Sequence, residues 1–236
     1  MPTDKSTKEP QYNLLYKVQE EHGIAQFGLM ANESWNQDPK RTLFTLARYK
    51  FVARMLEGRK HVLEVGCADA FATRLVQQSV GAVTAVDFDP VFIDDVNARM
   101  NKKWPMETFV HDVLKTPVPG QYDAAFAMDV LEHIEPASET AFVTNVLKSL
   151  SSDGVVIFGM PSLESQVYAS PQSKAGHVNC KSGDDFKAFM EQFCNTVFLF
   201  SMNDETLHTG FYKMAHYLIA VGCHIKPEYL SLEINE

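Results

Sequence analysis

The sequence predicts an α/β protein with a doubly wound, largely parallel sheet. In residues 61–70, His-Val-Leu-Glu-Val-Gly-Cys-Ala-Asp-Ala, an apolar β-branched run ends in small residues. This pattern indicates a buried parallel strand that stops at a tight turn, with a helix beginning near Phe71. A second such run, Val83 to Asp87, ends in an acid about 20 residues after Gly66. Strand, turn, helix, strand and acid at this spacing form the nucleotide-binding half of a doubly wound sheet.

The side chains of the first turn indicate which ligand it binds. Gly66, Ala68 and Ala70 are small, so a ligand can approach the backbone closely. A dinucleotide site needs G-x-G-x-x-G, which is absent here, and Glu64 before the turn would repel a pyrophosphate. A carboxylate there suits a cationic or amine-bearing ligand. S-adenosylmethionine (AdoMet) has a sulfonium, an α-amine and no phosphate.

Residues 64–70 resemble the first motif of the class I AdoMet-dependent methyltransferases, (D/E)-x-G-x-G-x-G, with alanine at two of the three glycine positions. The segment Asp129-Val-Leu-Glu-His-Ile resembles the segment after the fourth strand of small-molecule methyltransferases, including ubiquinone-pathway, menaquinone-pathway and sugar enzymes. The resemblance covers roughly residues 58–222. It implies seven strands in the order 3-2-1-4-5-7-6, strand seven antiparallel, and AdoMet as cofactor.

Alternating strand and helix patterns continue along the chain. Asp38 and Pro39 open a helix that runs to Gly58, with Asp38 as N-cap. Strands are expected at 62–65, 83–87, 107–110, 122–128, 154–160, 196–201 and 215–222, and helices at 71–80, 91–103, 137–150 and 184–193.

One domain with an N-terminal extension is expected. Residues 1–57 form an N-terminal tail and cap helices, and residues 58–236 form the AdoMet-binding methyltransferase domain. Residues 161–183 are polar, have no clear period and are too long for an ordinary connection, so we expect a lid or acceptor loop. Residues 202–213 would form a second loop over the same sheet edge.

The resemblance also implies roles for the cofactor-binding residues. Glu64, Gly66 and Ala68 belong to the binding turn. Asp87 would accept hydrogen bonds from both ribose hydroxyls, and Phe88 would lie against adenine. Asp112 would accept from the adenine amine and the Val113 amide would contact a ring nitrogen, although a turn cap explains Asp112 equally well.

Two further residues are candidates for the methionine end of AdoMet. Arg48 could bind the α-carboxylate bidentately, and its alternative interpretation is an exposed helix face. Asp129 could hold the α-amine or orient the acceptor, and its alternative interpretation is a helix cap.

Methyl transfer to a hydroxyl requires a base, and histidine suits this role at neutral pH. Three histidines lie where loops could reach the site: His133, His177 and His208. We assign His177 as base or acceptor contact, because loops over a rigid sheet carry such roles. His133 is the second catalytic candidate, and its alternative interpretation is a helix-end histidine bonded to a backbone carbonyl. No metal is expected, and the four cysteines lack C-x-x-C spacing.

Composition and net charge limit the classes of molecule that we expect this protein to bind. A net charge of −9 argues against nucleic acid, no apolar run could span a bilayer, and the polar N-terminus indicates a cytoplasmic protein. We expect a small polar acceptor, methylated at oxygen and sugar-like, and a homodimer is an option. Three alternatives stay open: a quinone or lipid-precursor enzyme, a non-catalytic AdoMet-binding module and an NAD-dependent oxidoreductase. The first would need an apolar tunnel from Phe198, Phe200, Phe211 and Tyr212.

Overall fold

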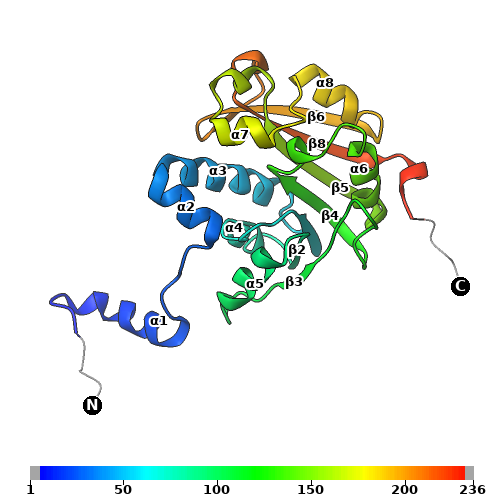
Figure 1. The fold of residues 1–236 in the computed structure, drawn as a ribbon. Helices are drawn as coiled ribbons and strands as arrows, with labels where there is room; N and C mark the ends of the chain where they lie inside the picture. The colour runs from blue at the N-terminus through cyan, green and yellow to red at the C-terminus, as the bar shows by residue number, and fades with distance from the viewer. Residues whose placement is uncertain (1–5, 232–236) are drawn as a thin grey trace, which may run out of the picture.

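One eight-stranded sheet organises the computed structural model, which describes residues 6–231 (Figure 1). The strands are β1 His61–Val65, β2 Ala82–Asp87, β3 Glu107–Val110, β4 Tyr122–Met128, β5 Leu150–Pro161, β6 Cys194–Asn203, β7 Thr206–His208 and β8 Tyr217–Ile225. Their order is β3-β2-β1-β4-β5-β8-β6-β7. Strands β1 to β5 pair in parallel, and β8 is antiparallel to β5 and β6. This confirms the expected order, with β8 as the seventh strand of the prediction.

The extra strand, β7, lies in the segment that we predicted to be a loop over residues 202–213. Asn203 pairs with Thr206, so only two residues connect β6 to β7. Asp204, the first of the two, has φ +50°, the left-handed conformation that tight hairpin turns require. A short hairpin therefore replaces part of the expected loop.

The helices are α1 Leu14–His22, α2 Leu29–Gln37, α3 Pro39–Met55, α4 Thr73–Gln77, α5 Pro90–Ala98, α6 Glu139–Lys148, α7 Pro171–Gly176 and α8 Gly183–Met190. Asp38 caps α3 as predicted, because its side chain accepts from the Lys40 amide. The segment 161–183 is more ordered than a loop: it contains a 3-10 helix, Glu164–Tyr168, and α7, which Ser170 caps.

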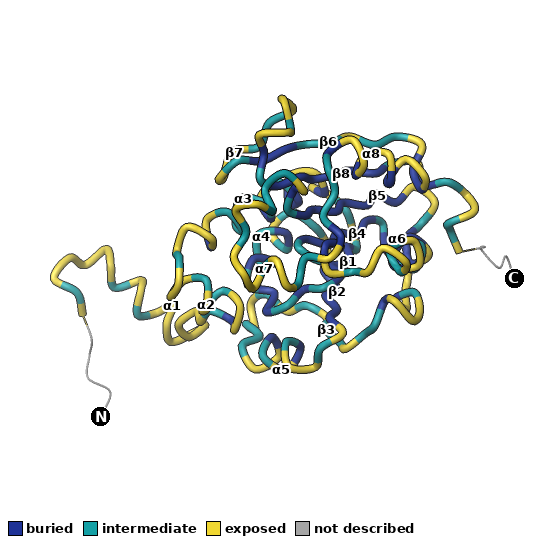
Figure 2. The backbone as a smooth tube through the Cα atoms, turned by 45° about the horizontal axis from the view of Figure 1, so that its top comes forward, coloured by how far each residue is buried: buried dark blue, intermediate teal, exposed yellow. Residues whose placement is uncertain are grey.

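Apolar cores lie on both faces of the sheet, whose strands are the buried centre of Figure 2. Helices α6 and α8 cover one face through side chains such as Leu147 and Phe186. Helices α3 and α4 cover the other through Val52 and Val76, and α5 packs near β2 and β3. Helix α1 extends away from this body (Figure 1). No helix within residues 6–231 is long and apolar enough to cross a membrane.

Candidate active site

The predicted site residues gather where the parallel strands end. Strand β1 lies between β2 and β4. The chain adds β2 and β3 on one side of β1 and then crosses over to add β4 and β5 on the other side. Ligands of doubly wound sheets bind outside the carboxyl ends of the strands at such a switch point. The loops after β1, β2, β3 and β4 carry most of the residues singled out by sequence.

The turn after β1 has the left-handed backbone that its small residues predict. Gly66, Ala68 and Ala70 have φ values of +72°, +44° and +48°. The amides of Gly66 and Cys67 both donate to the Val86 carbonyl, which ties the turn to the end of β2. A Cβ atom on Gly66 would lie 2.4 Å from Val130 Cγ2, so the segment after β4 approaches this backbone very closely. Alanine tolerates this turn at residues 68 and 70, but residue 66 has no room for it.

Asp87 is fixed at the end of β2 and is 5% exposed. Its Oδ2 accepts from the Ala68 amide at 2.9 Å and its Oδ1 from the Asp89 amide at 3.0 Å. Each oxygen keeps a lone pair for a further donor. The next residue, Phe88, is 73% exposed, and Asp89 caps α5 through the Val91 amide. The geometry suits two hydroxyl donors, and the ribose role of Asp87 stays a prediction.

Glu64 is buried between the sheet and two helices. Its Oε1 accepts from the Tyr49 hydroxyl of α3 at 2.7 Å, and its Oε2 from the Thr73 hydroxyl of α4 at 2.6 Å. Burial raises the pKa of the carboxyl from 4.5 to about 7, although both hydrogen bonds oppose the rise. Glu64 thus joins α3 and α4 to β1, and its direct contact with AdoMet stays a prediction.

Replacing Glu64 with glutamine should make stability less dependent on pH. The folded-state pKa is above the unfolded value, so the native state binds more protons between pH 4.5 and about 7. The stability contributed by the neutral carboxyl is full below pH 4.5 and is lost as pH rises through 7. Urea unfolding at several pH values should show the glutamine variant gaining about 3 kcal/mol relative to wild type between pH 4.5 and 8. A constant difference would contradict the raised pKa.

Arg48 and Asp129 form an ion pair that joins α3 to the end of β4. Nη1 of Arg48 lies 2.9 and 2.7 Å from the two carboxylate oxygens of Asp129. The guanidinium also lies over the Tyr217 ring, 3.7 Å from its centroid. The Arg48 side chain is 15% exposed, so it is not on an exposed helix face. Its Nε is buried and has no partner among the described residues, which leaves a donor for another acceptor.

The segment after β3 carries Asp112 and Val113. The Asp112 Oδ1 accepts from the Leu114 amide at 3.1 Å, and its Oδ2 lies 3.1 Å from Lys115 Nζ. The bond from the Leu114 amide therefore agrees with the turn-cap interpretation of Asp112. Val113 is buried, and its carbonyl accepts from Asn145. The adenine contacts assigned to both residues stay predictions.

His133 and His177 lie side by side although they are far apart in the sequence. Nδ1 of His133 is hydrogen-bonded to the carbonyl of Gly176, 43 residues further along the chain. Their ring centroids are 5.2 Å apart. Burial, and then the neighbouring His133 ring, lower the pKa of His177 below its usual value. His208 lies elsewhere, bonded to Ser201 and Asn203 of the β6–β7 hairpin.

Glu132 is the site residue that sequence reasoning missed. It follows β4 in a 3-10 helix, Leu131–His133, and is 1% exposed, yet neither carboxylate oxygen has a hydrogen-bond partner among the described residues. Burial and the Asp129 charge raise its pKa well above its usual range. Its position directly before His133 was the signal available in the sequence.

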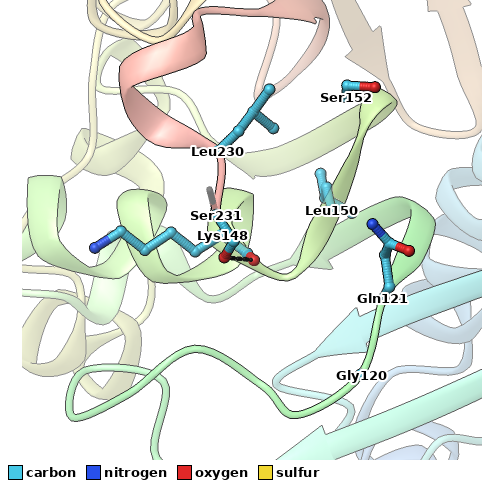
Figure 3. Close-up of a pocket in the computed structure, with 7 residues that line it drawn as sticks. All are labelled: Gly120, Gln121, Lys148, Leu150, Ser152, Leu230 and Ser231. Carbon is cyan, nitrogen blue, oxygen red and sulfur yellow. Dashed lines mark hydrogen bonds between the residues drawn. The ribbon is translucent and has the colours of Figure 1, made fainter. Parts of the chain in front are cut away.

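A separate pocket of about 270 Å³ lies at the opposite end of the sheet (Figure 3). It is lined by residues near the beginnings of β4 and β5 and by the C-terminal segment, including Gln121, Leu150 and Leu230. None of the residues predicted to bind cofactor or acceptor lines it, so we place the functional site at the carboxyl ends of the strands.

A match to a known protein family covers the strands that carry these residues. Residues 62–154, which span β1 to the first part of β5, match the methyltransferase domain family. With the sheet order, this match identifies residues 62–154 as a methyltransferase domain with the class I fold, whose members use AdoMet as methyl donor. The class, the fold and the cofactor expected from residues 64–70 and 129–134 are confirmed.

Two curated relatives match part of the chain. Nodulation protein S of Bradyrhizobium diazoefficiens is 26% identical over 144 residues, which are 59% of this chain and 68% of that protein. A ubiquinone biosynthesis O-methyltransferase of Xanthomonas campestris is 28% identical over 118 residues, 47% of this chain and 49% of that protein. The alignment therefore spans only about half the length of this second relative.

Solved structures share the fold at lower identity. The N-methyltransferase NodS from Bradyrhizobium japonicum, in complex with S-adenosyl-L-homocysteine, has a TM-score of 0.60 and 18% identity, covering 80% of this chain and 90% of that chain. A DhpI–SAH complex has a TM-score of 0.61 and 18% identity, covering 84% and 92%.

Proposed function

We propose that this chain transfers a methyl group from AdoMet to an oxygen of a small polar molecule, such as a sugar-like metabolite. The observation that carries this proposal is the polar character of the region beyond β4. Glu132, His133 and His177 converge there, and Gln166 lies 2.9 Å from His177. A polar acceptor could exchange hydrogen bonds with these groups, whereas an apolar acceptor would leave them unpaired.

The cofactor half of the proposal depends on three residues. AdoMet supplies an electrophilic methyl group on a sulfonium. Asp87 would hold the ribose through its two anchored oxygens. The unpartnered Nε of Arg48 is a donor for the α-carboxylate, and Asp129 beside it offers a negative charge for the α-amine.

The alternative of a quinone or lipid-precursor acceptor is less well supported. The aromatic residues that would form its tunnel pack on neighbouring rings or are exposed. Phe200 packs on Phe51 of α3, with ring centroids 5.0 Å apart, and Phe198 is 54% exposed. Phe211 is 63% exposed and stacks with Tyr212. Because one relative is a ubiquinone biosynthesis O-methyltransferase, the test below includes a hydrophobic acceptor.

Turnover on defined acceptors tests the proposal. The protein would be incubated with ¹³C-methyl AdoMet and a panel of sugars, other polyols, amines and a hydrophobic phenol, with S-adenosylhomocysteine formation and product NMR as readouts. O-methylation of a polar hydroxyl would support the proposal. An N-methyl product or a preference for the phenol would refute the acceptor class. AdoMet binding without turnover on any acceptor would indicate a non-catalytic module, and binding of NAD(H) without AdoMet would refute the methyltransferase function.

Replacing His177 with alanine should reduce kcat by roughly 10²–10⁴-fold if it acts as base, because a positioned base contributes that much to proton transfer. The affinity for AdoMet, measured by calorimetry, should not change. His208→Ala is the matched control, since His208 bonds only within its hairpin among the described residues, and its kcat should equal that of wild type. An unchanged kcat for His177→Ala would remove His177 from the mechanism.

A further inference from the structure

Three side chains with metal-binding atoms converge beyond the end of β4. One carboxylate oxygen of Glu132 and one ring nitrogen each of His133 and His177 all lie within 4.8 Å of one another. His133 Nε2 lies 4.0 Å from Glu132 Oε1. Two residues come from the segment after β4 and the third directly follows α7, so the fold and not one local motif brings them together.

Hydrogen bonds orient both histidines for coordination. Nδ1 of His133 lies 2.8 Å from the Gly176 carbonyl, an acceptor, so this nitrogen carries the proton. Nδ1 of His177 lies 2.9 Å from the Gln166 Oε1, which likewise accepts. In both neutral rings Nε2 is then left with its lone pair. A hydrogen bond from the second ring nitrogen to a carbonyl is the usual outer support of a metal-bound histidine.

Glu132 supplies an independent sign of a ligand. Its carboxylate is almost completely buried, and neither oxygen has a hydrogen-bond partner among residues 6–231. Burying a carboxylate without a hydrogen-bond partner costs more free energy than burying most neutral polar groups in that way. We therefore expect a partner that the described residues do not supply. Its own backbone carbonyl accepts from the amides of Val178 and Asn179, which holds the segment with His177 beside the carboxylate.

We propose that Glu132, His133 and His177 bind a divalent transition-metal ion through one carboxylate oxygen and two Nε2 atoms. Two imidazoles and one carboxylate suit Mn²⁺, Fe²⁺, Co²⁺ or Zn²⁺, whereas Mg²⁺ and Ca²⁺ prefer oxygen ligands alone. Bond lengths to such ions are about 2.0–2.2 Å, so the side chains would close on the ion by roughly 1 Å. The His133 side chain is 48% exposed, so its ring can shift on the solvent side while its Nδ1 stays bonded to the Gly176 carbonyl.

Three protein ligands leave coordination positions open, as catalytic metal sites do. The site lies at the carboxyl end of β4, where the proposed acceptor would bind, and only this last point rests on the proposed function. An acceptor hydroxyl on the ion would ionise more readily. His177 would then position the acceptor through the metal and would not itself act as base.

Metal titration of tag-free protein tests the site. The protein would be stripped with EDTA, desalted and titrated with Co²⁺, followed by visible absorption, and with Mn²⁺ and Zn²⁺, followed by calorimetry. We expect one equivalent to bind to wild type. Affinity should fall at least 10-fold in His133→Ala, His177→Ala and Glu132→Gln. His224→Ala is the matched control, because His224 is exposed on β8, and its affinity should be unchanged.

Circular dichroism and melting would confirm that each variant is folded. The two histidine variants keep the test valid if the buried Glu132→Gln variant does not fold. Absence of saturable 1:1 binding, or wild-type affinity in both folded histidine variants, would overturn the proposal. These readouts need no acceptor, so they are distinct from a failure of the proposed function. If turnover is found, excess Mn²⁺ should partly restore His177→Ala, which a lost base would not allow.

Discussion

Replacing Asp87 with alanine is expected to weaken AdoMet binding by one to two orders of magnitude, about 1–3 kcal/mol. The carboxylate is held by the Ala68 amide from the β1 turn and by the Asp89 amide from the β2 turn. It is therefore preorganised for two neighbouring hydroxyl donors, and its loss removes both charge-assisted bonds. The variant also leaves the Ala68 amide without its acceptor, so a decrease in stability is expected as well.

Asp89→Ala separates these two effects. Asp89 lies two residues further along and caps α5, with its Oδ1 accepting from the Val91 amide at 2.9 Å. Its removal should cost about 1 kcal/mol of stability and leave the AdoMet dissociation constant unchanged. Calorimetry and urea unfolding of both variants give the comparison. Wild-type affinity in Asp87→Ala would show that the ribose assignment is wrong.

Local sequence patterns were sufficient to predict the nucleotide half of the fold. The run from His61 to Ala70 contains strand, turn and helix start within ten residues, and each step has its own chemistry: β-branched residues, then small residues, then an amphipathic segment. The Asp38–Pro39 helix start was readable for the same reason.

Contacts between distant residues were not readable in this way. Arg48 was expected to bind a carboxylate, and it binds that of Asp129, 81 residues away in the sequence. A single sequence gives no signal for such a pair, because each residue is ordinary in its own segment. The same holds for Glu132, which looks like an exposed turn acid until the sheet and the α7 segment bury it.

The short helices and the strand within residues 161–183 and 202–213 were not readable for another reason. Residues 161–183 and 202–213 are short of periodic apolar residues, so they were interpreted as irregular. Single caps and turns decide their structure instead: Ser170 before Pro171 starts α7, and a left-handed Asp204 closes the β6–β7 hairpin. These signals are one or two residues long, which is too short for a periodicity to reveal.

Replacing Gly66 with alanine should destabilise the protein by about 2–5 kcal/mol. A left-handed residue with a side chain costs about 1–2 kcal/mol, and forcing an extra carbon into a packed site costs about 1–3 kcal/mol more. The new Cβ would lie 2.4 Å from Val130 Cγ2, and Val130 is β-branched and stiff. The turn or the segment after β4 must move, so AdoMet affinity should also fall.

Gly58→Ala is the matched control for this substitution. Gly58 has φ +84°, close to the +72° of Gly66, but a Cβ there would meet nothing within 4 Å. It should show only the conformational cost, about 1–2 kcal/mol, with AdoMet affinity unchanged. The difference between the two variants in urea unfolding then measures the contact between the β1 turn and Val130 alone. Equal losses would mean that the turn tolerates a side chain at residue 66 and that close packing against the β4 segment does not shape the site.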